Sequence, residues 1–177
     1  YQVGEGTSST TKRWTPYMTI ASDVITVTAG RYFTCAILSN NVVKCWGWNE
    51  HGQLGAGTAT STSPFAISTP TTATVVSSIS NIVGLALGWG HSCVLTLSGA
   101  VYCWGLNNNG QLGDGTTTPR YNTAAIVSGM TSGIATIVSL DGHVCALTTG
   151  GIYYCWGFNN KGQIGDATNT YSKIPKQ

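Results

Sequence analysis

The stretch Val101-Tyr-Cys-Trp-Gly-Leu-Asn-Asn-Asn-Gly-Gln-Leu-Gly113 decides the fold, because closely related stretches occur at two other places in the chain. They are Val43-Lys-Cys-Trp-Gly-Trp-Asn-Glu-His-Gly-Gln-Leu-Gly55 and Tyr153-Tyr-Cys-Trp-Gly-Phe-Asn-Asn-Lys-Gly-Gln-Ile-Gly165. The three copies align without a gap, and the alignment extends back to Gly30, Gly88 and Leu140. Self-similarity of this kind is the sequence signature of a repeat architecture.

Each copy shows two short runs of β-branched and aromatic residues separated by a turn, and a third run precedes them. No stretch has a helical period with caps. The predicted hairpins are Phe33–Leu38 with Val42–Trp46, Val94–Leu97 with Val101–Trp104, and Val144–Thr148 with Ile152–Trp156. The preceding strands are predicted at Asp23–Thr28, Asn81–Leu87 and Gly133–Ser139. Several short strands per repeat with one aromatic-glycine motif predict an all-β fold of β-propeller blades.

The predicted organisation is one repeat domain over residues 1–177. Its parts are a partial repeat with leading strands (1–28), a first repeat (29–86), a second repeat (87–139) and a third repeat with the tail (140–177). The partial repeat is identified by Gln2-Val-Gly-Glu-Gly-Thr7, which matches Gln111-Leu-Gly-Asp-Gly-Thr116. The same element returns at Gln163-Ile-Gly-Asp-Ala-Thr168, so the sequence reaches the same phase of the repeat near both of its ends.

Three motifs carry a resemblance to a known family. The motifs His91-Ser-Cys-Val-Leu95, Val101-Tyr-Cys-Trp-Gly-Leu-Asn107 and Gly110-Gln-Leu-Gly-Asp-Gly-Thr116 resemble the regulator-of-chromosome-condensation repeat. The resemblance implies blades of four antiparallel strands, which the family closes into a ring. Propeller rings contain about four to eight blades. About three repeats are too few for closure, so either the chain is a piece of a longer propeller or its copies complete one another. We expect blades that are open or completed by neighbouring copies.

All six cysteines occupy two equivalent columns of the repeat, ten positions apart. A three-residue loop whose third residue is Asn41, Gly99 or Gly151 would place each cysteine opposite its partner. A two-residue loop would place the two cysteines on opposite faces, and the sequence alone does not decide between these turns. The repeated pairing favours three disulfides over buried free thiols, and no column has zinc-ligand spacing. The predicted bonds are Cys35–Cys45, Cys93–Cys103 and Cys145–Cys155. They predict an oxidising, extracellular location.

The composition argues against several functional classes. Only 8% of the 177 residues are charged, the formal net charge is +2, and the cations are scattered singly. Nucleic-acid binding requires a clustered basic surface, so we predict no nucleic-acid partner. No apolar run approaches the ~20 residues that span a bilayer, so we predict no membrane insertion. No nucleophile, phosphate-binding or dinucleotide motif occurs, so we predict no enzymatic activity, no catalytic residue, no metal and no cofactor.

The aromatic residues and histidines divide into two groups. Trp46, Trp104 and Trp156 are in register and are predicted to fill the blade core or the contact between blades, and His91 and His143 share a structural column. The loop residues Glu50-His51, Asn108-Asn109 and Asn160-Lys161 are predicted to be exposed. Trp89 aligns with Arg31 and Asp141, which favours either an exposed interface anchor or a locally packed surface side chain. The candidate interface residues are Trp14, Trp48, His51, Trp89, Tyr121 and Lys161.

Members of the resembled family include a nucleotide-exchange factor, a plant ultraviolet-B photoreceptor and a secreted bacterial inhibitor of β-lactamases. The cysteine pairs and the low charge favour the secreted bacterial type. We therefore expect a non-enzymatic extracellular structural protein that assembles head to tail into a fibre or other surface assembly. The alternative is a secreted module that recognises a protein or glycan through its loops. In the assembly, the segment before Ala21 is expected to pack against the C-terminal blade of a neighbouring copy. Such contacts give rings or filaments, and the uneven repeat spacing favours a filament.

Overall fold

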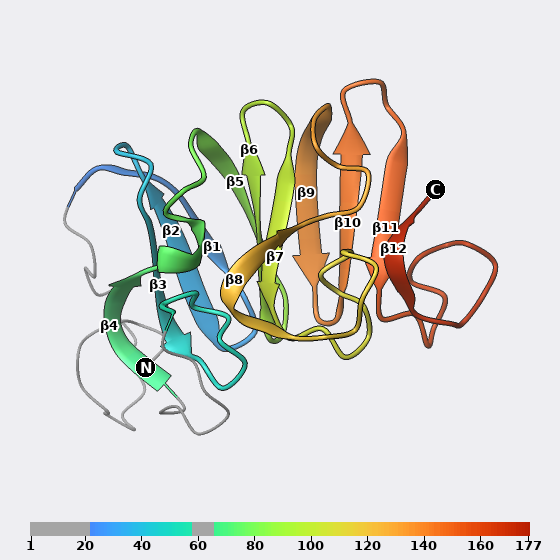
Figure 1. The fold of residues 1–177 in the computed structure, drawn as a ribbon, viewed down its shortest axis with the longest axis horizontal. Helices are drawn as coiled ribbons and strands as arrows, with labels where there is room; N and C mark the ends of the chain where they lie inside the picture. The colour runs from blue at the N-terminus through green and yellow to red at the C-terminus, as the bar shows by residue number, and fades with distance from the viewer. Residues whose placement is uncertain (1–21, 58–65) are drawn as a thin grey trace, which may run out of the picture.

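The computed structural model describes residues 22–57 and 66–177, and these ranges form three four-stranded antiparallel sheets (Figure 1). The first sheet contains β1 (Val24–Ala29), β2 (Phe33–Leu38), β3 (Val43–Trp48) and β4 (Ala66–Thr72). The second contains β5 (Ile82–Leu87), β6 (His91–Thr96), β7 (Val101–Gly105) and β8 (Arg120–Ile126). The third contains β9 (Ile134–Leu140), β10 (His143–Thr148), β11 (Tyr153–Gly157) and β12 (Ser172–Lys176). A 3-10 turn, η1 (Thr74–Val76), precedes the second sheet. The predicted all-β blade architecture is confirmed.

Each sheet runs in chain order, so consecutive strands pair with one another. The first strands of the sheets meet at the junctions, where β5 contacts both β1 and β9. Proline removes a donor from a ladder and is confined to sheet edges. Pro70 and Pro175 accordingly lie in the edge strands β4 and β12.

The hairpins between β2 and β3, β6 and β7, and β10 and β11 have three-residue loops. In the first of them, the Leu38 amide donates to the Val42 carbonyl at 2.9 Å, and Asn41 adopts φ 66°. Gly99 and Gly151 take the same left-handed conformation at the equivalent positions. This register sets each cysteine directly opposite its partner. The three predicted disulfides are present: Cys35–Cys45, Cys93–Cys103 and Cys145–Cys155.

The hydrophobic core lies between the sheets. One cluster joins residues of the first sheet, such as Ile37 and Val43, to Leu85 and Trp104 of the second. A second cluster joins Leu95 and Val101 of the second sheet, among others, to residues of the third. The blades are therefore held together by the apolar faces that they turn toward each other, as in a stacked repeat protein.

The sheets are offset from the sequence repeats by one strand. β5 begins within the repeat predicted at 29–86, and β9 begins within the repeat predicted at 87–139. The repeat boundaries thus describe the sequence period, whereas each blade begins with the last strand of the preceding period. Gln2–Thr7, Trp14 and the expected packing of the segment before Ala21 lie outside the described residues. The third sheet already has its four strands from this chain, so a neighbouring copy is not needed to complete it. No helix in the described ranges has the length and apolarity that crossing a bilayer requires.

Candidate functional site

The turn after each Trp-Gly motif is organised by a buried asparagine. The Asn107 side-chain oxygen accepts the Leu112 amide at 3.0 Å, and its side-chain nitrogen donates to the carbonyls of Thr116 and Thr118. Asn159 makes the equivalent bonds in the third sheet. Because a buried amide that satisfies several main-chain groups fixes a loop, these turns are rigid supports for the surface above them.

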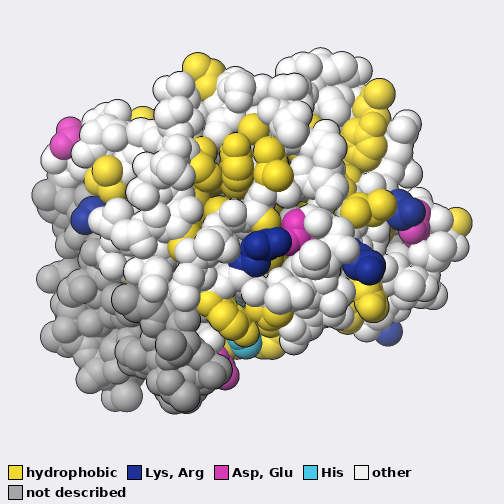
Figure 2. Space-filling model, in the orientation of Figure 1, with side chains coloured by type: hydrophobic (Ala, Val, Ile, Leu, Met, Phe, Trp, Pro, Cys, Tyr) yellow, Lys and Arg dark blue, Asp and Glu magenta, His cyan; other side chains and the backbone are white. Residues whose placement is uncertain are grey.

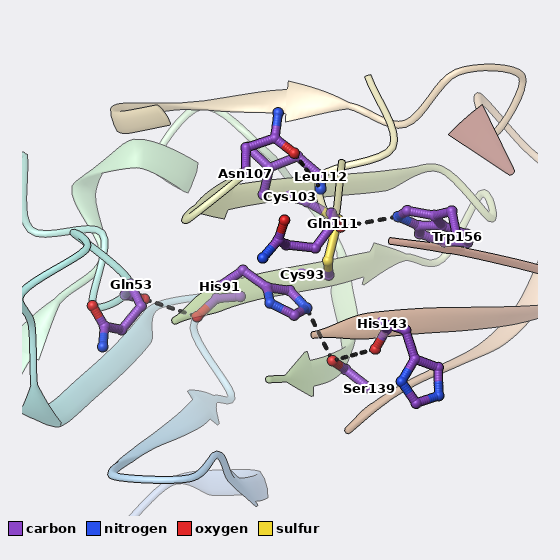
Figure 3. Close-up of a disulfide and its surroundings, with 11 residues drawn as sticks. Gln53, His91, Cys93, Cys103, Asn107, Gln111, Leu112, Ser139, His143 and Trp156 are labelled. Carbon is purple, nitrogen blue, oxygen red and sulfur yellow. Dashed lines mark hydrogen bonds between the residues drawn. A yellow bond between two sulfur atoms is a disulfide. The ribbon is translucent and has the colours of Figure 1, made fainter. Parts of the chain in front are cut away.

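Neighbouring blades are joined by hydrogen bonds from tryptophan. The Trp104 indole nitrogen donates to the main-chain carbonyl of Gln53 at 3.0 Å. The Trp156 indole nitrogen donates to the main-chain carbonyl of Gln111 at 3.0 Å (Figure 3). Ser92 Oγ donates to the same Gln53 carbonyl at 2.8 Å. Trp104 and Trp156 are fully buried, and Trp46 is also buried. The structure thus places Trp104 and Trp156 in the contacts between blades.

His91 is a buried structural residue that links the second and third sheets. Its Nε2 lies 3.0 Å from Ser139 Oγ, and that hydroxyl donates to the His143 carbonyl at 3.1 Å (Figure 3). Because the Ser139 hydroxyl donates its one hydrogen to this carbonyl, it accepts in the bond with His91. We therefore assign a proton to His91 Nε2. Burial, with a smaller contribution from His143, lowers the pKa of His91 to about 3. A neutral, inaccessible imidazole does not suit acid–base catalysis near neutral pH. Within the described ranges, no cluster of ligating side chains could hold a metal ion.

The loops between the first two strands of each sheet meet at one end of the structure. The Arg31 amide donates to the Gly88 carbonyl at 3.3 Å, and the Trp89 amide donates to the Asp141 carbonyl at 2.7 Å. The side chains of Arg31 and Asp141 form a salt bridge of 3.7 Å and are more than half exposed. Arg31, Trp89 and Asp141 occupy the same column of the repeat, so this column brings three different side chains together.

An aromatic cluster covers the junction between the first and second sheets. Trp48 lies against Tyr32, His51 and Trp89, with ring centroids 5.9, 5.0 and 5.9 Å away. The Arg31 guanidinium lies 5.2 Å from the Tyr32 ring centroid and 6.0 Å from that of Trp89, within the range of cation–π attraction. We call the surface formed by this cluster, Arg31 and Asp141 the loop face.

His51 differs from the prediction that it is exposed. The structure places it half-buried against Trp48 and Trp89. The burial lowers the pKa of His51, and the Glu50 charge partly opposes that shift. The prediction was wrong because the covering side chain comes from a different repeat. Asn109 is also half-buried, whereas Glu50 and Lys161 are exposed as predicted.

Two cavities open beside the Arg31–Asp141 pair. The larger, of about 480 Å³, lies where β1, β5 and β9 end. Its lining is Ala29, Gly30, Arg31, Leu87, Gly88, Ser139, Leu140 and Asp141. The smaller, of about 220 Å³, lies between the second and third sheets. The lining of the smaller cavity is Arg31, Trp89, Asn109, Gln111, Asp141, Gly142 and Phe158.

The sequence pointed to the loop face through one feature, the repeat column of Trp89, in which the three copies have three unlike residues. Arg31 and Asp141 belong to the same column but were not selected, because the sequence did not show that the three loops converge. Of the other candidate interface residues, Tyr121 is half-buried on β8 and is not a lining residue of either cavity. Trp14 lies outside the described residues.

The third sheet presents a second candidate surface. Val101 is fully buried under the third sheet, but the equivalent Tyr153 is 56% exposed. Likewise Leu95 is 5% exposed and the equivalent Leu147 is 40% exposed. The exposed side chains of Tyr153, Leu147 and Val138 form what we call the rear face of the third sheet. The rear face matches the surface by which the second sheet contacts the third.

The first sheet presents the complementary surface. Ile82 and Leu85 of the second sheet are buried against the first, at 4% and 8% exposure. The equivalent Val24 and Val27 of the first sheet are 42% and 60% exposed, and we call them the front face. Charged side chains are sparse over the view of the molecule in Figure 2. The described structure therefore exposes apolar side chains from both kinds of surface that meet between its blades, although Trp46 on the front side of the first sheet is buried.

These features define a β-propeller repeat protein, and comparison with protein-family models agrees. Models described as the regulator of chromosome condensation (RCC1) repeat match residues 24–53 and 82–111, and residues 43–95 and 98–129. The chain belongs to this repeat family. The match over 43–95 runs from β3 of one sheet to β6 of the next, which is the offset between repeat and blade described above.

Similar proteins include a ligase and a receptor. The chain is 34% identical over 158 residues to human probable E3 ubiquitin-protein ligase HERC4, covering 87% of this chain and 14% of the ligase. It is 32% identical over 155 residues to the ultraviolet-B receptor UVR8 of Arabidopsis thaliana, covering 87% of this chain and 34% of the receptor. The chain therefore spans between a seventh and a third of the length of these relatives.

Solved structures show the same fold at low sequence identity. Yeast RCC1 (Prp20) bound to Kap60 superposes with a TM-score of 0.76 at 20% identity, over 87% of this chain and 36% of that one. Human WBSCR16 superposes with a TM-score of 0.71 at 20% identity, over 86% of this chain and 37% of that one.

Proposed function

We propose that this protein is a non-catalytic structural building block that assembles head to tail, with the rear face of one copy stacked on the front face of the next. One observation carries the proposal: several apolar columns that are buried between its own blades, those of Leu147 and Val27 among them, are exposed on the two outermost sheets. The setting is extracellular, as the three disulfides favour an oxidising compartment.

The junctions inside the chain provide the template for the junction between copies. At each internal junction, the rear columns of one sheet pack on the front columns of the next. The contact between copies would place Leu147 and Tyr153 of one copy over Val24 and Val27 of another. Burying a side chain of this size contributes about 1.5–3 kcal/mol. Large exposed apolar patches on soluble proteins commonly mark association sites.

A contact between two different faces is heterologous, so each copy uses one face and leaves the other available. Such contacts produce closed rings if the rotation closes, and open filaments if it does not. We favour a filament, because the repeats are unevenly spaced and nothing in them imposes a planar closure. The low charge of this chain and its cysteine pairs fit the secreted bacterial type of the family, to which we propose that it belongs.

The test compares the oligomeric state of matched variants of the oxidised protein. Light scattering after size exclusion, together with electron microscopy, should show assemblies that grow with protein concentration. Leu147→Asp should reduce the association constant at least ten-fold, because it places a charge in the contact. Leu97→Asp, at another exposed leucine on a hairpin loop, should leave it unchanged. A monomer at 100 μM, or equal association by both variants, would refute the proposal.

A second candidate function is recognition of a protein or glycan through the loop face. The aromatic cluster, the Arg31–Asp141 pair and the adjoining cavities support it. Aromatic residues and arginine are the residues most enriched in binding hot spots. The relative in the yeast RCC1 structure binds the protein Kap60. In this case the protein remains monomeric until a partner is added, so the same sizing experiment separates the two candidates.

A further inference from the structure

The same position between neighbouring blades is filled at one junction and open at the other. Between the first and second sheets, His51 lies 5.5 Å from Trp89 by ring centroids and covers Gly90. A Cβ atom added to Gly90 would approach the His51 ring to 2.6 Å. At the equivalent Gly142 of the next junction, the three nearest atoms to such a Cβ all belong to Phe158 of the same sheet.

The difference follows from the residues at equivalent columns. Asn109 stands where the first sheet has His51, and Asp141 stands where the second sheet has Trp89. Two aromatic rings of the first junction are thus replaced by two short polar side chains at the second. The space left by this replacement is the 220 Å³ cavity, with Trp89 and Phe158 among its lining residues.

The chemistry of the cavity identifies what fits there. Trp89 and Phe158 offer aromatic surfaces, which prefer edge-to-face or offset contact with another ring. The Asp141 carboxylate can accept a hydrogen bond from a ring N–H or O–H, and its side chain is 60% exposed. At the first junction the equivalent space is taken by the His51 imidazole, a planar ring that carries an N–H. The protein's own packing therefore provides a precedent for an aromatic occupant.

The size of the cavity restricts the occupant further. Pockets for drug-sized ligands occupy about 300–1,000 Å³, so 220 Å³ suits one side chain rather than a complete cofactor or an oligosaccharide. We propose that the cavity between the second and third sheets is a docking pocket for a single aromatic side chain of a partner polypeptide, with its ring against Trp89 and Phe158 and its polar hydrogen directed to Asp141. The pocket lies on the loop face, so the proposal is independent of head-to-tail stacking.

The test uses N-acetyl-tryptophanamide as the probe and the oxidised, folded chain as the receptor. Ligand-observed NMR should show millimolar binding, at least five-fold tighter than that of N-acetyl-leucinamide. The Trp89 indole N–H signal, assigned with Trp89→Phe, should shift more than that of Trp48. Asn109→Trp should fill the pocket and weaken binding at least ten-fold. Lys161→Trp places the same ring at the equivalent, exposed column of the third sheet and should bind as the unmodified protein does.

Several outcomes would overturn the proposal. Equal binding of the tryptophan and leucine probes would show that the pocket does not select rings. Tighter binding of methyl β-N-acetylglucosaminide than of the tryptophan probe would identify a saccharide site instead. Undiminished binding to Asn109→Trp would place the probe elsewhere. If that variant does not fold, Asn109→His supplies the same test with the residue that the equivalent turn of the first sheet already accommodates. Light scattering of every sample keeps self-assembly separate from probe binding.

Discussion

Two buried tryptophans join neighbouring blades, and the carbonyls that accept their hydrogen bonds differ in the number of other donors they have. The Gln53 carbonyl accepts both Trp104 Nε1 and Ser92 Oγ, at 3.0 and 2.8 Å. The Gln111 carbonyl accepts Trp156 Nε1 at 3.0 Å, and Val144 occupies the column of Ser92. Among the described residues, the main-chain carbonyl of Gln111 therefore accepts from one side-chain donor, whereas that of Gln53 accepts from two. We expect Trp156→Phe to destabilise the protein more than Trp104→Phe.

The expected magnitudes follow from burial and from the fate of the carbonyl. Both indoles are fully buried, so the loss of ring volume costs about 2 kcal/mol in each variant. At Trp104 the lost hydrogen bond adds about 1 kcal/mol, because Ser92 continues to satisfy the acceptor. At Trp156 the main-chain carbonyl of the fully buried Gln111 is left without a side-chain donor, which costs about 2–3 kcal/mol, the upper part of the range for an unsatisfied buried group. The difference between the variants should be about 1–2 kcal/mol.

Denaturant unfolding of the oxidised proteins, with both fluorescence and circular dichroism as probes, gives the two free energies of unfolding. The Ser92→Val variant tests the explanation at a single junction, because it removes the second donor to the Gln53 carbonyl and so gives the second sheet the arrangement of the third. In that background, Trp104→Phe should become as costly as Trp156→Phe. Equal costs in the unmodified background, or a cost at Trp104 that Ser92→Val does not change, would refute the account of shared acceptors.

Two further predictions concern the disulfides and pH. Replacing Cys93 and Cys103 together by alanine should lower the free energy of unfolding by about 2–3 kcal/mol, because each bond closes a short loop; an unchanged unfolding midpoint would contradict this. The His91 pKa of about 3 lies below its unfolded value of 6.5, so the unfolded chain binds more protons between these pH values and stability falls as pH drops from 6.5 toward 3. His91→Phe, which installs the residue that Phe33 provides in the first sheet, should flatten this dependence in thermal melts at pH 4 and pH 7; an equally steep loss would assign it to other groups.

The parts of the fold that the sequence predicted best are those that repeat. Three aligned copies reveal the hairpins, and the loop residues Asn41, Gly99 and Gly151 suit the left-handed conformation that a three-residue loop requires. The disulfides follow from that register, although the sequence left a two-residue turn open. Local backbone chemistry and repetition together were sufficient here.

The fourth strand of each sheet was not located because its signal is weak. β4 and β12 contain Pro70 and Pro175, and β8 contains polar residues that interrupt its apolar pattern. Edge strands tolerate proline and need only one paired side, so their sequences carry little of the alternation that identifies a strand. The number of strands per blade therefore came from the family resemblance, and their positions came only from the structure.

At the loop face, comparing equivalent residues of the three repeats becomes informative once the structure shows which blades are neighbours. The tryptophan, asparagine and glutamine columns keep the same residue in all three copies. The asparagine and glutamine side chains accept the same main-chain amides in each turn. The columns of His51 and Trp89 change at every copy, and they meet between blades rather than within one. A single repeat viewed alone makes His51 an exposed loop residue, whereas the adjacent repeat covers it. Variation in these columns gives each junction its own surface, aromatic at the first and a polar-rimmed pocket at the second. The constant columns build the blades, and the variable columns distinguish one junction from the next.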